Sequence, residues 1–225
     1  MLLHEHLLDR AARDGSTPFL THYRAEDRTE LSARSFANWV AKTANLLTDE
    51  LGLDPGDRVE LQVAADHPGH WMTLVWVMAT WQAGLTVVDS EGDLVVTGPD
   101  PEGVPAGPAL ACSLHPLGLG LRGLPEGWSD FSTLALAQPD AWFGSGPDSP
   151  DDRAWDVAGR TLSFAQLTTD APQSRRVLVR DPEDAWAAAH ACLIGPLLGG
   201  GSSVIACDVS DTALARIAES ERVDA

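Results

Sequence analysis

The chain has 225 residues, of which 33 are acidic and 15 are basic, so its formal net charge is −18 at pH 7. A surface this acidic repels the phosphates of nucleic acids and of anionic lipids, which argues against either as a partner. Hydrophobic residues make up 44% of the chain and charged residues 21%, as is typical of a globular protein with a sizeable core.

Hydrophobic periodicity in the first 138 residues predicts an alternation of helices and strands. Ser32 is a favourable N-cap for the long helix of this region, and Gly52 is a favourable residue to end it. The elements expected, in chain order, are a helix at 2–12, hairpin strands at 17–23 and 29–31, a helix between 32 and 52, a strand at 58–64, a helix at 68–82, and strands at 85–88, 93–97 and 109–113. Strands joined through helices by short connections favour parallel pairing in a doubly wound sheet.

Residues 139–152 are rich in Gly, Ser, Pro and Asp and show no periodicity, so we interpret them as a loop. They separate an N-terminal α/β lobe at 1–138 from a smaller α/β lobe at 153–225 that packs on the first. Its expected elements are a strand at 160–163, a short helix at 164–169, a strand at 176–179, a helix at 182–198, a strand at 203–206 and a helix at 211–220. The predicted fold class is α/β, with layered, doubly wound and largely parallel sheets.

Tryptophans and cysteines are expected mainly in the core. The helix at 68–82 places an apolar stripe on one face, and Trp76 lies off that stripe, so we expect Trp76 to be partly exposed. Cys112, Cys192 and Cys207 lie in apolar settings without metal-type spacing, which indicates buried thiols.

The N-terminal residues lack the charged start and the continuous apolar stretch of a signal peptide. The longest apolar run, at 71–81, is too short and too often interrupted to cross a bilayer. A cytoplasmic location is the resulting expectation.

Several segments resemble the beginning of the adenylate-forming (AMP-binding) acyl-CoA synthetases. The most specific is LGLDPGDRV at 51–59, which is similar to the pattern G-[LV]-x-x-G-D-R-V of that family. WQAGLTVV at 81–88 resembles a second family pattern, and GPLLGGGSSVIACD at 195–208 resembles a helix that ends in PLLxGG before a strand. The resemblance covers nearly the whole chain and implies the layered fold of the N-terminal domain of those enzymes, although the chain spans less than half of a complete synthetase.

The residues with which such enzymes bind ATP are missing from the pattern. The glycines at 199–201 lead into a strand and not a helix, so they indicate a turn and not a phosphate cradle. The family loop T-S-G-[ST]-T-G-x-P-K-G is expected between 140 and 173, where only FGSGP at 143–147 remains. Lys42, the one lysine of the chain, lies in a predicted amphipathic helix and is expected to be solvated.

Two further family features are also absent. A family histidine would fall near Asp184, and the mobile C-terminal lid would follow Ala225. The resemblance thus implies a short, degenerate bacterial member, with the arginine-rich composition of an actinobacterial protein, that lacks the phosphate loop and the lid.

Polar residues at the carboxyl ends of strands are the candidate ligand contacts, because α/β sheets bind ligands at that edge. These candidates are Asp66, His67, His70, Asp89, Glu91 and His115. A third strong ligand does not accompany the two histidines at 67 and 70, so no metal site is predicted. No catalytic residue is assigned and no cofactor is expected; ATP, Mg²⁺ and CoA would be expected only of a working ligase.

Three hypotheses for function stay open. The leading one is a non-adenylating, truncated relative of the AMP-dependent acyl-CoA synthetases that acts as a binding, regulatory or structural module. The alternatives are half of a split adenylate-forming ligase that a partner chain completes, and an unrelated hydrolase that uses His67 or His115. The expected partner is a small molecule or a protein, with neither nucleic acid nor membrane involved, and the sequence indicates no oligomeric state.

Overall fold

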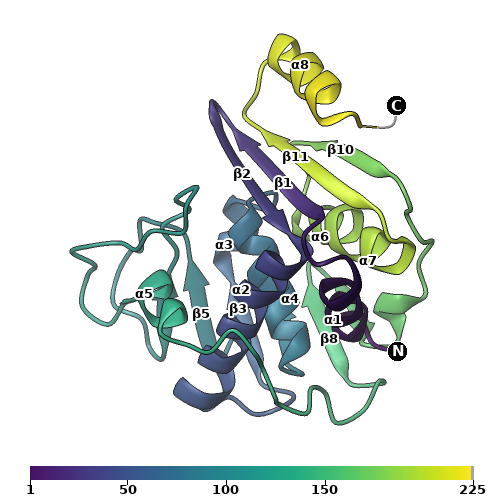
Figure 1. The fold of residues 1–225 in the computed structure, drawn as a ribbon. Helices are drawn as coiled ribbons and strands as arrows, with labels where there is room; N and C mark the ends of the chain where they lie inside the picture. The colour runs from purple at the N-terminus through teal and green to yellow at the C-terminus, as the bar shows by residue number, and fades with distance from the viewer. Residues whose placement is uncertain (224–225) are drawn as a thin grey trace.

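The computed structural model describes residues 1–223 and contains two β-sheets with helices between them and on their outer faces (Figure 1). The strands are β1 (Pro18–Arg24), β2 (Asp27–Ser32), β3 (Arg58–Leu61), β4 (Thr86–Val88), β5 (Leu94–Thr97), β6 (Ala109–Ala111), β7 (Ser129–Asp130), β8 (Arg153–Val157), β9 (Arg160–Ser163), β10 (Arg176–Arg180) and β11 (Ser202–Cys207). The helices are α1 (Leu3–Asp14), α2 (Ala33–Asn45), η1 (Leu46–Glu50), α3 (Gln62–Asp66), α4 (Trp71–Gln82), α5 (Phe131–Leu136), η2 (Gln166–Thr168), α6 (Ala185–Ala189), η3 (His190–Ile194), α7 (Gly195–Gly199) and α8 (Asp211–Glu221).

The sheets are mixed but mostly parallel, so the predicted α/β class with layered, largely parallel sheets is confirmed. The seven-stranded sheet has the order β7-β6-β5-β3-β4-β8-β9, and the four-stranded sheet has the order β10-β11-β1-β2. Within residues 1–223, only the hairpins β1–β2 and β8–β9 pair antiparallel. Each sheet contains strands from both sides of residues 139–152, because β8 pairs with β4 and β1 pairs with β11.

Helix α4 forms the centre of the molecule. It contacts β4 of one sheet, β1 of the other and the neighbouring helix α2, and all of its residues are buried. The expectation that Trp76 is partly exposed is therefore wrong. Its side chain is fully buried, and its indole N–H donates to the sulfur of Cys112 at 3.1 Å. A helix covered on every side has no solvent face, so its apolar stripe does not identify the buried positions.

Several predicted boundaries also change. The strand expected at 58–64 ends at Leu61, where the short helix α3 begins. The helix expected at 182–198 starts at Ala185 and is interrupted by the π-helical segment η3. Strands β7 and β8 and helix α5 were not predicted, because their short sequences carry little periodicity.

Lys42 anchors the start of the segment at 139–152 and is not freely solvated as expected. Its ammonium donates to the carbonyl of Gln138 at 2.6 Å and lies 2.7 Å from a carboxylate oxygen of Asp140. The side chain is 18% exposed. Asn45, one turn further along α2, donates to the carbonyls of Pro139 and Ala141 at 3.0 Å. The two side chains together fix residues 138–141 against α2.

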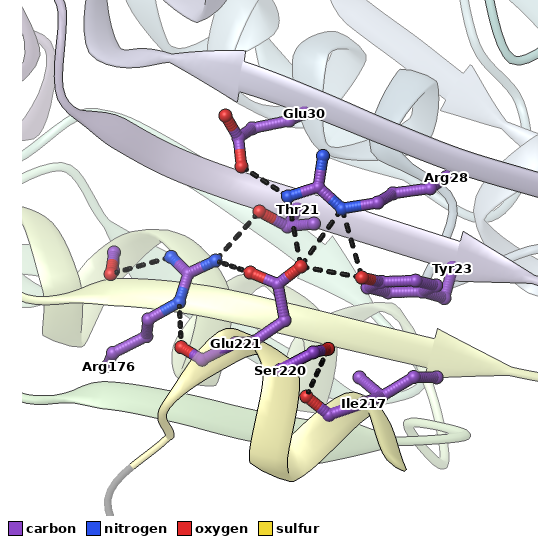
Figure 2. Close-up of polar contacts among 9 residues, drawn as sticks. Thr21, Tyr23, Arg28, Glu30, Arg176, Ile217, Ser220 and Glu221 are labelled. Atoms are coloured by element: carbon purple, nitrogen blue, oxygen red, sulfur yellow. Dashed lines mark hydrogen bonds and ion pairs between the residues drawn. The ribbon is translucent and has the colours of Figure 1, made fainter. Parts of the chain in front are cut away.

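Helix α8 lies on the outer face of the four-stranded sheet (Figure 1). Ile217 is its one buried residue and packs with Val204, Ala206 and Val209, and the partly buried Ala213 and Leu214 lie against the same cluster. A polar network adds to this packing: the carboxylate of Glu221 accepts hydrogen bonds from Tyr23 at 2.6 Å, Arg28 at 2.9 Å and Arg176 at 2.5 Å (Figure 2). These donors come from β1, β2 and β10, so one side chain joins the helix to three strands.

Within residues 1–223 no helix is both long enough and apolar enough to span a membrane.

Candidate ligand-binding site

Two adjoining cavities open at the carboxyl ends of the parallel strands. The larger, here called the acidic cavity, has a volume of about 560 Å³ and follows the ends of β3, β4 and β8. The smaller, here called the histidine cavity, has a volume of about 150 Å³ and follows the ends of β1 and β11. Asp66, at the end of α3, lines both cavities. The fold thus brings the strand ends of both sheets to one region, as is usual for ligand sites in α/β proteins.

The acidic cavity combines apolar walls with carboxylates. Its apolar part includes Leu61, Val87, Val88, Trp155 and Val157, and its carboxylates are Asp66, Asp89, Glu183 and Asp184. Among the residues that the structure describes, no lysine, arginine or histidine side chain lines it. A ligand in this cavity therefore meets apolar surface and negative charge.

Two of these carboxylates also hold the backbone. Asp89 accepts a hydrogen bond from the N–H of Ala158 at 2.8 Å, in the turn between β8 and β9. Asp184 is the N-cap of α6 and accepts from the N–H of Ala187 at 2.7 Å. In the described part of the chain, neither Asp66 nor Glu183 has a side-chain hydrogen bond or an ion-pair partner.

A third cavity of about 140 Å³ shares Trp155, Ala158 and Asp184 with the acidic cavity and adds Arg160 and Trp186. The guanidinium of Arg160 lies 5.0 Å from the centre of the Trp186 ring, a cation–π contact. Trp155 contacts Trp186 with ring centres 5.4 Å apart. The Trp155 side chain is 1% exposed, and its buried indole N–H has no hydrogen-bond partner among the described residues.

The histidine cavity contains two buried imidazoles in contact. The rings of His22 and His70 lie 4.7 Å apart, and each residue is 4% exposed. His70 caps α4, because its Nδ1 accepts from the N–H of Met72 at 3.1 Å. Burial, followed by the charge of Arg24, lowers the pKa of His22 to about 4. Burial, followed by His22 and Arg24, lowers the pKa of His70 to about 2. Both rings are consequently neutral at physiological pH.

Cys207 and His67 complete the histidine cavity. Burial, followed by the charges of Asp181 and Asp208, raises the pKa of the Cys207 thiol to about 11, so the thiol stays protonated. Burial also lowers the pKa of His67. Cys112 and Cys192 are buried as expected, whereas Cys207 is only partly buried. Across residues 1–223, no three His, Cys, Asp or Glu side chains are grouped so that they could hold a metal ion.

The six residues proposed from sequence as ligand contacts do not all come together. Asp66, His67 and His70 line the histidine cavity, and Asp66 and Asp89 line the acidic cavity. Glu91 is exposed and lies 3.6 Å from Arg58. His115 lines neither cavity, and its Nδ1 accepts from the N–H of Leu117 at 3.0 Å.

Sequence reasoning missed several residues that line the cavities. They include His22, Trp155, Glu183, Asp184 and Cys207, none of which was proposed as a contact. Cys207 ends β11 and His22 lies two residues before the end of β1, so the rule that selected Asp66 could have found both, whereas Trp155 is the middle residue of β8, a strand that was not predicted.

The glycine-rich remnant at 143–147 lies outside both cavities. Gly146 lies against Gly84 and the carbonyl of Gln82, at the C-terminal end of α4. His70 lies at the other end of that helix, which is about 18 Å long for its 12 residues.

No family model matches the chain. The chain is 34% identical over 148 residues to the "TIGR03089 family protein" of Mycobacterium tuberculosis, an alignment that covers 60% of this chain and 59% of that protein.

Solved structures with similar folds cover almost the whole chain. The acyl-CoA synthetase of Brucella canis matches with a TM-score of 0.71 at 17% identity, over 99% of this chain and 46% of that one. The N-terminal domain of FACL13 from M. tuberculosis matches with a TM-score of 0.71 at 15% identity, over 99% of this chain and 61% of that one. An adenylation–PCP di-domain, NpsA-ThdA from Klebsiella oxytoca, matches with a TM-score of 0.67 at 18% identity, over 99% of this chain and 42% of that one.

The chain therefore has the fold of the N-terminal domain of acyl-CoA synthetases and adenylation domains, as the sequence motifs predicted. It spans about half the length of the solved proteins that it matches, and the aligned region is a similar share of the mycobacterial relative.

Proposed function

We propose that this chain is a small-molecule-binding relative of the adenylate-forming enzymes that does not itself form adenylates. The observation that carries the proposal is the connection between β8 and β9. It lies in the interval where the resemblance places the lysine-ended phosphate loop, and it consists of Ala158 and Gly159 alone. A two-residue turn has too few backbone N–H groups to surround a triphosphate.

The charges next to this turn support the proposal. The acidic cavity adjoins the turn through Ala158 and contains four carboxylates. A carboxylate about 6 Å from a phosphate charge costs about 3 kcal/mol at an effective dielectric constant of about 20. Magnesium would offset part of this repulsion, so ATP–Mg²⁺ is the form to test.

The arginines of this interval do not replace the missing lysine. Arg153 lies 2.8 Å from a carboxylate oxygen of Asp156, and Arg160 stacks on Trp186. The position near Asp184, where the family has a histidine, holds a helix N-cap carboxylate.

Pyrophosphate exchange tests the proposal. The full chain is incubated with ATP–Mg²⁺, labelled pyrophosphate and a panel of carboxylic acids, and a complete acyl-CoA synthetase serves as the positive control. We expect no exchange above the protein-free blank. Acid-dependent exchange that disappears in an Ala65→Trp variant would overturn the proposal, because Ala65 is exposed and lines the acidic cavity, part of which a tryptophan there would occupy.

A partner-completed ligase is the second candidate, and the fold that 99% of the chain shares with the N-terminal domain of FACL13 supports it. It predicts a co-purifying chain that restores acid-dependent exchange. Exchange that stays at the blank level with every co-purified chain added would count against it.

The hydrolase hypothesis gains no comparable support. In the part of the chain that the structure describes, no hydroxyl or thiol donates to the imidazole of His67 or His115. The Cys207 thiol, which shares a cavity with His67, has its pKa raised to about 11 and is therefore a poor nucleophile.

A further inference from the structure

Strand β10 forms one edge of the four-stranded sheet. It is the outermost strand in the order β10-β11-β1-β2 (Figure 1). Its residues 176–179 are only half-buried, whereas the middle of the neighbouring strand β11 is fully buried. Helix α8 lies on the face of the sheet, in a cluster with Ala206 of β11 and Tyr23 of β1, and not along this edge. An edge strand presents backbone groups to which another strand can bind.

The backbone groups that point outward belong to three residues of β10. At the two ends of the strand, the carbonyl of Arg175 and the N–H of Asp181 make hydrogen bonds to β11, of 3.1 Å and 3.0 Å. Because the backbone groups of successive residues point to opposite sides of a strand, those of Arg176, Leu178 and Arg180 point to the open side. Within residues 1–223 these outward groups have no hydrogen-bond partner.

The sequence of β10 is RVLVR, which reads the same in both directions. Two copies of the strand that pair antiparallel about a twofold axis at Leu178 are therefore self-complementary. Leu178 faces Leu178 of the second copy, and Val177 faces Val179. In this register Leu178 exchanges both backbone hydrogen bonds with its counterpart, and Arg176 exchanges both with Arg180. Apolar pairs across two strands stabilise a sheet, so the register is favourable at its centre.

Charge complementarity favours the same register. Three residues out from Leu178 on either side, Arg175 of one copy lies opposite Asp181 of the other, and the twofold axis provides this pair twice. Arg175 is exposed and has no ion-pair partner among residues 1–223, and the side chain of Asp181 is 50% exposed. Opposite charges across two strands attract each other, so a second copy supplies the partner that Arg175 lacks in its own chain.

The arginines within β10 do not prevent this pairing. Arg176 faces Arg180 of the second copy, but each guanidinium already lies against a carboxylate of its own chain. Arg176 lies 2.5 Å from Glu221, and Arg180 lies 2.6 Å from Asp211. Together with Arg175 they bring three of the 15 basic residues of this acidic chain to one edge, where the general repulsion between two copies is therefore weakest.

We propose that β10 is a self-association surface at which two copies of this chain form a symmetric dimer. The two four-stranded sheets join edge to edge, with β10 antiparallel to β10 of the second copy. A strand of another protein would meet the same backbone groups, but the palindrome and the match of Arg175 with Asp181 fit a second copy. The interface consists of one short strand from each copy, so the dimer is weak and depends on protein concentration.

Sedimentation equilibrium of the full chain tests the proposal. The parent should pass from monomer to dimer at concentrations up to about 1 mM. Arg175→Glu replaces two attractions by two repulsions and should raise the Kd for dimerisation at least about tenfold. Arg122→Glu is the matched control, because it makes the same change in net charge at an exposed arginine between β6 and β7, in the other sheet. Its Kd should stay within about twofold of that of the parent.

Disulfide cross-linking tests the register. In Leu178→Cys the new thiol faces its own counterpart, with the two Cα atoms about 5.5 Å apart, so mild oxidation should give a covalent dimer. Arg175→Cys lies on the same side of the molecule, but in this register the two copies of residue 175 are about 20 Å apart, so it should stay uncross-linked. The parent, with its partly buried Cys207, is oxidised in parallel to give the background.

A parent that stays monomeric up to about 1 mM would overturn the proposal. An equal rise of the Kd in Arg175→Glu and Arg122→Glu would do the same, because it would reflect net charge alone. Cross-linking of Arg175→Cys that is as efficient as that of Leu178→Cys would contradict the register. The charge variants alter exposed side chains, so their result does not depend on how well Leu178→Cys folds. None of these measurements involves ATP, and the pyrophosphate-exchange test therefore decides the proposed function separately.

Discussion

The carboxylate of Asp89 accepts a hydrogen bond from the backbone N–H of Ala158 at 2.8 Å, which joins the end of β4 to the turn between β8 and β9. Ala158 and Gly159 have φ angles of 51° and 75°, the left-handed geometry of a two-residue hairpin turn. A short turn that a neighbouring strand holds thus lies within residues 140–173, the interval in which the resemblance places a phosphate loop.

Removing this hydrogen bond should loosen the turn. Asp89→Ala is expected to lower the free energy of unfolding by about 1 kcal/mol, because the Ala158 N–H loses its partner. Ala158→Gly should have the opposite effect and raise the free energy of unfolding by up to about 1 kcal/mol, because glycine adopts a positive φ angle without strain. Urea denaturation of the two variants measures both effects, and an Asp89→Ala protein as stable as the parent would contradict the role given to Asp89.

Acid should destabilise the protein through the histidine cavity. In the unfolded chain a histidine has a pKa near 6.5, whereas burial lowers the pKa of folded His22 to about 4. The unfolded state therefore takes up protons that the folded state does not, and stability falls as the pH drops from 6.5 towards 4. His70, with a pKa of about 2, adds to the same slope. Each imidazole contributes at most about 1.4 kcal/mol per pH unit.

The His22→Phe variant separates the contribution of His22 to the loss of stability in acid from the contribution of the carboxylates. The variant keeps an aromatic ring but removes the titrating group and the buried Nε2, which has no partner among residues 1–223. Its stability at neutral pH should equal or exceed that of the parent. The pH dependence between 6.5 and 4 should be shallower. An unchanged slope, from denaturation curves at several pH values, would show that His22 does not titrate as expected.

Glu221 should hold α8 to the sheet. Burial alone would raise its pKa, but hydrogen bonds from Tyr23, Arg28 and Arg176 outweigh burial and lower the pKa to about 2 (Figure 2). Glu221→Gln should lower the free energy of unfolding by about 1–3 kcal/mol, because a partly buried Arg176 loses its carboxylate.

The network also has a pH signature. Its contribution to the free energy of unfolding is complete above a pH of about 4.5, the ordinary pKa of a glutamate. That contribution is lost as the pH falls through 2. Glu219→Gln, an exposed position on the same helix, is the control and should change stability little. Hydrogen exchange of α8 that is equally fast in the parent and in Glu221→Gln would contradict a role for the network.

Local sequence patterns predicted most elements, but the contacts of single side chains needed the tertiary structure. Ser32 and Gly52 identified the extent of the α2 region because caps and stops act locally. Trp76 and Lys42 were misjudged because their exposure depends on a second sheet and on a loop nearly one hundred residues away.

In the candidate site, too, some residues could be predicted from local sequence and others only from the tertiary structure. Asp66 and Asp89 follow strand ends and were proposed from that position alone. His22 and Trp155 reach the cavities because β1 pairs with β11 and β8 pairs with β4, pairings between segments far apart in sequence. Hydrophobic periodicity carries no information about which strands become neighbours.

Calorimetric titration of the full chain with ATP–Mg²⁺ tests most directly the proposal that the chain does not form adenylates. Four carboxylates and a two-residue turn predict no saturable binding at millimolar nucleotide, in the parent and in Ala65→Trp alike. A micromolar Kd in the parent that is abolished in Ala65→Trp would contradict the proposal, because it would place the nucleotide in the acidic cavity.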